Sequence, residues 1–87
     1  MRYTATVSGH PEVVRLMLCE VAEGTYLFTY TRAEDGAASA DELHLSSDLA
    51  RQVAQERYGV APDLWSPLPD PPAGCRQDWI APTPIKV

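Results

Sequence analysis

Cysteine, basic residues and long apolar runs are all scarce in this sequence. The two cysteines, Cys19 and Cys75, are too few for the disulfide framework of a small secreted domain, so we expect both to be free thiols. No apolar stretch approaches the roughly 18–20 residues of a membrane-spanning helix, and residues 1–7 lack the apolar core of a signal peptide. The expectation is a cytoplasmic protein that does not enter a membrane.

Positive charge is also scarce, because seven Lys and Arg residues stand against twelve Asp and Glu residues, for a formal net charge of −5. Such a chain repels phosphate backbones, and its arginines are scattered singly instead of being interleaved with aromatic residues. The P-loop, GxGxxG, GxSxG and HExxH motifs are absent. We therefore expect no nucleic-acid partner and no cofactor, and no small-molecule substrate is evident.

The chain has room for a single domain of 87 residues, and its first part predicts three strands. Polar and apolar residues alternate over 2–8, as in a half-buried strand, whereas residues 13–22 are apolar on both faces. Residues 25–32 are rich in threonine and aromatic residues, and the short connection before them predicts a hairpin. We expect these segments to form an antiparallel three-stranded meander.

The hydrophobic period changes after a polar loop at 33–41. Apolar residues recur every three or four positions over 47–58, between Ser46, which is suited to cap a helix start, and Gly59, which is suited to end one. This pattern predicts one amphipathic helix over 47–58 that covers one face of the sheet. The expected fold class is therefore α+β.

A proline-rich tail follows the helix, with seven of the eight prolines beyond residue 61. The prolines exclude a helix, and large apolar residues such as Trp65 and Trp79 are not typical of a flexible linker. We expect residues 61–87 to pack on the body as a strap. Its last part, residues 82–87, is predicted to be an edge strand whose two prolines remove donors from the outer edge.

The residues that could carry chemistry are not spaced like a known site. By number alone, a Cys2His2 zinc set is available in His10, Cys19, His44 and Cys75. Zinc ligands usually come in close pairs, however, and these do not. Nor does spacing support a nucleophilic Cys75 with a histidine base. Asp70 and Asp78 could act as a carboxylate pair, but a role as hydrogen-bond acceptors in turns is favoured.

Seven residues are candidates for an interaction site. The two tryptophans stand among prolines, as aromatic residues do in surfaces that grip extended peptides. The favoured alternative is that both rings fill the open ends of a small core. The third predicted strand contributes an aromatic face, and the loop around residue 75 contributes a thiol and a carboxylate. The candidates are Trp65, Trp79, Cys75, Asp78, Tyr26, Phe28 and Tyr30.

Short sequence phrases resemble a group of short uncharacterised bacterial proteins, over roughly residues 16–82. The most specific is the signature Pro-Asp-Pro-x-x-Gly-Cys-x-x-Asp-Trp-Ile, at residues 69–80; the others are Leu-Cys-Glu (18–20), Glu-Gly-Thr-Tyr-Leu-Phe (23–28) and Tyr-Gly-Val (58–60). This resemblance implies that the tail is a defined module, and it implies no activity. A looser similarity is to HicB-type antitoxins, small acidic domains in which a Leu-Pro-Gly-Cys-like turn precedes the helix instead of following it.

The amount of apolar β-surface suggests a function. One helix about 10 Å wide covers roughly two strands, so we expect part of the sheet to stay bare. This predicts a protein-interaction or assembly module, either a homodimer joined through its sheet or a binder of a protein partner. The alternatives are a HicB-like regulator that binds a basic protein and, less favoured, a small enzyme that uses Cys75.

Overall fold

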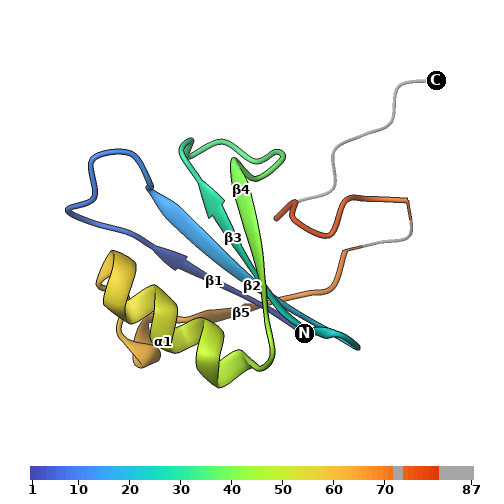
Figure 1. Cartoon of the computed structure of the whole chain (residues 1–87). Helices are drawn as coiled ribbons and strands as arrows, with labels where there is room; N and C mark the ends of the chain where they lie inside the picture. Colours follow the sequence, from blue (N-terminus) through green and yellow to red (C-terminus); the bar gives the residue numbers. More distant parts are fainter. Residues whose placement is uncertain (72–73, 81–87) are drawn as a thin grey trace.

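Five antiparallel strands form one sheet in the computed structural model, which describes residues 1–71 and 74–80 (Figure 1). The strand order is β4-β3-β2-β1-β5, so β4 and β5 form the two edges. In chain order the elements are β1 (Arg2–Thr6), β2 (Arg15–Val21), β3 (Gly24–Tyr30), β4 (Ala40–His44), helix α1 (Ser47–Tyr58), a 3-10 turn η1 (Pro62–Leu64) and β5 (Ser66–Leu68). None of the described helices is long and apolar enough to cross a membrane.

The predicted α+β class, with an antiparallel sheet and one helix, is confirmed, and the three predicted strands form β1, β2 and β3; the sheet has two further strands, β4 and β5, so the predicted meander is only part of it. The segment that forms β4, Ala-Asp-Glu-Leu-His, has no β-branched or aromatic residue, so its pattern did not indicate a strand. The β5 strand lies within the predicted strap and pairs Pro67 with Tyr3 of β1. A proline is tolerated there because β5 is an edge. The strand predicted over 82–87 lies outside the described residues.

The helix has the predicted bounds, and local chemistry explains both ends. The Ser46 hydroxyl accepts a hydrogen bond from the Leu49 amide at 3.2 Å, which satisfies one of the free donors of the first turn. Gly59 ends the helix with φ +70°, a left-handed conformation that glycine adopts without strain. Ala50 and Ala54 are fully buried against the sheet, so their small side chains allow a close approach.

The sheet is covered on both sides, which corrects the expectation of a bare apolar face. Helix α1 lies on the first side, called here the helix face, and the described residues beyond β5 lie along the other (Figure 1). That other side, the tail face, buries Met17, Cys19, Phe28 and Tyr30. Residues 69–71 and 74–80, called the tail, contribute Ile80 to this second core. A single copy of the chain therefore shields most of its own aromatic surface.

Candidate functional site

A buried arginine holds the tail against the sheet. Arg2 lies opposite Cys19 of β2 on the tail face and is only 2% exposed. Its guanidinium donates hydrogen bonds to the carbonyl oxygens of Pro69, of Gln77 at 3.1 Å and of Trp79. A planar group with five donors suits several carbonyls at once. These hydrogen bonds join the first strand to a segment almost eighty residues later in the sequence.

Asp78 connects the tail to the loop before β4. Its side chain is buried, and its carboxylate accepts hydrogen bonds from the Ala38 amide at 2.8 Å and from the Arg76 guanidinium at 3.2 Å. Its carbonyl oxygen accepts the hydroxyl of Tyr30. Burial, together with the Asp78 charge, raises the pKa of the Tyr30 phenol. Asp78 does accept a backbone amide, as predicted, but from a donor forty residues earlier in the chain.

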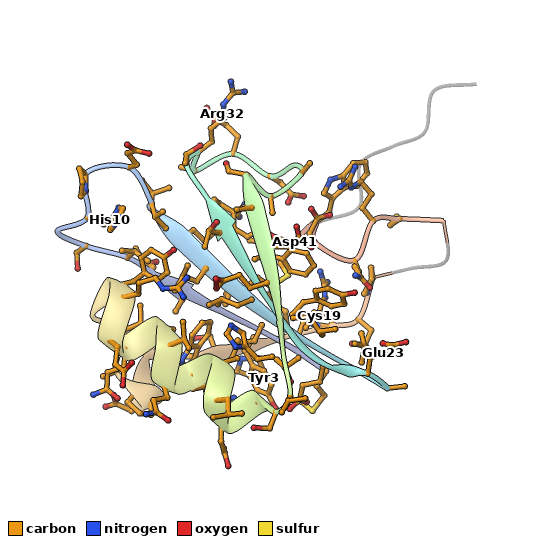
Figure 2. All side chains as sticks on the ribbon, in the orientation of Figure 1. Tyr3, His10, Cys19, Glu23, Arg32 and Asp41 are labelled. Carbon is orange, nitrogen blue, oxygen red and sulfur yellow. The ribbon has the colours of Figure 1, made fainter. Side chains whose placement is uncertain are left out.

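A pocket of about 320 Å³ opens where the tail meets β3 and β4. It is lined by Phe28, Ala38, Asp41, Arg76, Gln77 and Asp78. The Phe28 ring stacks on Tyr26, with ring centroids 5.6 Å apart, and Figure 2 shows Asp41 on β4 near the tail. The pocket therefore combines an aromatic surface with two carboxylates and one guanidinium. Three of the predicted interaction residues, Tyr26, Phe28 and Asp78, meet in or beside it.

The two tryptophans lie apart from each other. Trp65 is buried in the helix-face core, and the Arg51 guanidinium lies 5.8 Å from the centre of its ring. Trp79 is half-buried in the tail, where its carbonyl accepts from Arg2. In the described part of the chain, neither indole nitrogen has a hydrogen-bond partner. Trp65 therefore acts as a packing residue, and Trp79 belongs to the segment that covers the tail face.

The structure does not bring the cysteines and histidines together. His10 accepts the amides of Glu12 and Val13 and packs against Tyr58, 5.3 Å between ring centroids. Cys19 lies in the tail-face core, where burial raises the pKa of its thiol, and Cys75 lies half-buried in the tail. Among residues 1–71 and 74–80, no three His, Cys, Asp or Glu side chains form a group that could hold a metal ion.

The β4 edge of the sheet differs from the β5 edge. The β5 strand has three residues and a central proline, whereas β4 has five residues and no proline. An edge strand leaves half of its backbone N–H and C=O groups without a strand partner, and proline blunts such an edge. Among the described strands β4 pairs only with β3, so its outer backbone groups face away from the sheet.

Apolar and charged side chains surround the β4 edge. Leu43, on the strand, is 49% exposed; Leu45, just beyond it, is 86% exposed; and Leu49, in the first turn of α1, is 44% exposed. On the helix face, Glu42 accepts two hydrogen bonds from Arg57, at 2.7 and 2.8 Å, and this pairing lowers the pKa of the Glu42 carboxyl. Three exposed leucines within seven residues of sequence therefore lie on or beside an edge strand that contains no proline.

The chain matches no protein-family model, no curated protein and no solved structure. A functional proposal therefore rests on the geometry and charge described above. Sequence reasoning had missed two parts of this site, Arg2 and the β4 strand. The alternation of polar and apolar residues over 2–8 placed Arg2 on a polar face of its strand, and nothing local to the sequence indicates the carbonyls that surround it.

Proposed function

We propose that this protein is a small assembly module that self-associates through its sheet, by pairing of β4 with β4 of a second copy. The observation that carries the proposal is the asymmetry between the two edges. The β5 edge is short and interrupted by Pro67, whereas the β4 edge is longer, has no proline and is flanked by exposed leucines. Natural edge strands are usually protected by proline, charge or cover, and of these β4 has only the two acidic side chains of Asp41 and Glu42.

The edge is a better contact than either face of the sheet. Helix α1 covers one face and the tail covers most of the other, so face-to-face association would require displacement of one of them. Pairing along β4 needs no such displacement, because the outer backbone groups already point outward. Two-fold pairing of two identical edges is also closed, so it ends at a dimer.

Binding of a basic protein partner is the second candidate function. The formal net charge of −5 favours a cationic partner, and the pocket beside β4 is lined by the carboxylates of Asp41 and Asp78. Salt distinguishes the two functions. Added salt screens the repulsion between two copies that each carry −5, and so strengthens a dimer, whereas it weakens a complex with a cationic partner.

Sedimentation velocity tests the proposal directly. The unmodified protein is expected to be a dimer at high micromolar concentration, and Leu43→Lys is expected to be a monomer because a lysine on an edge strand blocks further pairing. The matched control is Ser66→Lys on the β5 edge, where the side chain is also exposed and the dimer should persist. A monomeric unmodified protein, or equal loss of dimer in both variants, would refute edge pairing at β4.

A further inference from the structure

Symmetry limits how two β4 strands can pair. A two-fold axis normal to the sheet makes the strands antiparallel and keeps the helix face of one copy continuous with that of the other. Side chains directly opposite each other must then lie on the same face. Asp41 and Leu43 lie on the tail face, paired with Phe28 and Tyr26, and residues 40, 42 and 44 lie on the helix face. One residue must therefore sit opposite its own copy.

The residue opposite its own copy lies on the two-fold axis and is called the centre of the pairing. The charges on β4 discriminate between the possible centres. A centre at Asp41 or at Glu42 places two identical carboxylates directly opposite each other, which is unfavourable. A centre at Leu43 pairs two leucines instead, and it places Glu42 of each copy opposite His44 of the other. A centre at Ala40 or at His44 leaves only the end of the strand in register.

We propose that Leu43 lies on the two-fold axis of a β4–β4 dimer, an inference that rests on the proposed self-association. The His44 side chain provides independent support. Its Nε2 atom is buried, lies 3.5 Å from a Glu42 oxygen of its own chain and has no hydrogen-bond partner in the described part of the chain. Glu42 of the second copy supplies a further carboxylate beside that imidazole, whose contact with Glu42 of its own chain is long for a hydrogen bond.

The same register covers two of the three exposed leucines. Leu43, half-exposed in a single copy, meets its own counterpart on the tail face. Leu45, the most exposed of the three, comes to lie opposite Asp41, on the β4 side of the pocket. On the tail face the contact is thus made of one central leucine pair flanked by two Leu45–Asp41 pairs, and on the helix face of acid–histidine pairs.

Site-directed disulfide formation tests this register. The parent is Cys75→Ser, in which the remaining Cys19 is buried. Leu43→Cys should form a disulfide-linked dimer under mild oxidation, because a pair on the axis lies within the Cα separation that a disulfide needs. It should do so about tenfold or more faster than Glu42→Cys, Asp41→Cys or Leu45→Cys alone. In this register Glu42→Cys pairs would lie about 8 Å apart, and Asp41→Cys or Leu45→Cys pairs about 14 Å apart. A mixture of Asp41→Cys and Leu45→Cys should cross-link to each other.

The outcomes separate this inference from the function on which it rests. Rapid cross-linking of Glu42→Cys in place of Leu43→Cys, with a dimeric parent in sedimentation, would overturn the register and leave self-association standing. Cross-linking of Leu45→Cys alone as fast as Leu43→Cys would show random collision and would also overturn it. A monomeric parent would overturn both the register and the proposed function.

Discussion

Replacement of Arg2 by methionine should release the tail and cost much of the stability of the fold. The substitution keeps an unbranched side chain but removes the donors to three carbonyl oxygens, those of Pro69, Gln77 and Trp79. A hydrogen bond to a charged group contributes about 1.5–3 kcal/mol net. The three contributions do not add fully, because a released tail can hydrate its carbonyls, so we expect a loss of about 3–5 kcal/mol.

That loss is large for a chain of this size, whose total stability is on the order of 4–13 kcal/mol at typical values per residue. Urea unfolding gives the free energy, and trypsin cleavage after Arg76 reports how often the tail opens. Arg57→Met is the matched control, because Arg57 is half-exposed and its pair with Glu42 should contribute less than about 1 kcal/mol. If Arg2→Met unfolded at the same urea concentration as its parent, with unchanged cleavage, the tail would be held by packing and not by Arg2.

Two further predictions concern the hairpin and the buried tyrosine. Gly24→Ala should destabilise the fold by about 2 kcal/mol more than Gly9→Ala, because a Cβ at Gly24 would lie 2.2 Å from the main-chain oxygen of His44 at the end of β4, whereas Gly9 also has a positive φ, +82° against +149°, but open space around it. Equal midpoints in urea would contradict this. The pKa of the Tyr30 phenol is raised in the folded state. The stability that the neutral phenol contributes is therefore fully present below pH 10, and it is lost as pH rises above about 10. Unfolding measured at pH 8 and pH 11 should therefore show a smaller decline for Tyr30→Phe than for the parent, and an identical decline would refute the assignment.

Local sequence signals predicted the elements that carry strong periodicity or capping. The helix follows from Ser46, from Gly59 and from the spacing between them. Of the three strands of the central hairpins, β1 follows from alternation, β2 from a segment that is apolar on both faces, and β3 from its threonine and aromatic content. The edges could not be predicted in this way. The β4 segment is mostly polar, and β5 contains Pro67, so each becomes a strand only because a neighbouring strand offers it hydrogen bonds.

The sequence predicted several residues of the candidate site, but it did not predict which of them meet in space. Tyr26, Phe28 and Asp78 were named from aromatic content and loop position, and they do converge at the pocket. Trp65 was named with them but lies on the other side of the sheet. Which residues meet depends on contacts of the tail with β1 and with the loop before β4, and the hydrogen bonds that make these contacts join residues 75 and 40 positions apart.

The hydrogen bonds between Arg2 and the tail also bear on biosynthesis. A ribosome makes β1 first, yet the strand that pairs with its outer side and the carbonyls that surround its arginine come from residues 66–80. Until that segment emerges, a nascent chain keeps one side of β1 open and leaves the Arg2 guanidinium and the apolar tail face exposed to water. The last quarter of the sequence therefore controls when the first strand can settle, and chains that stall before it are the ones we expect to aggregate or to need a chaperone.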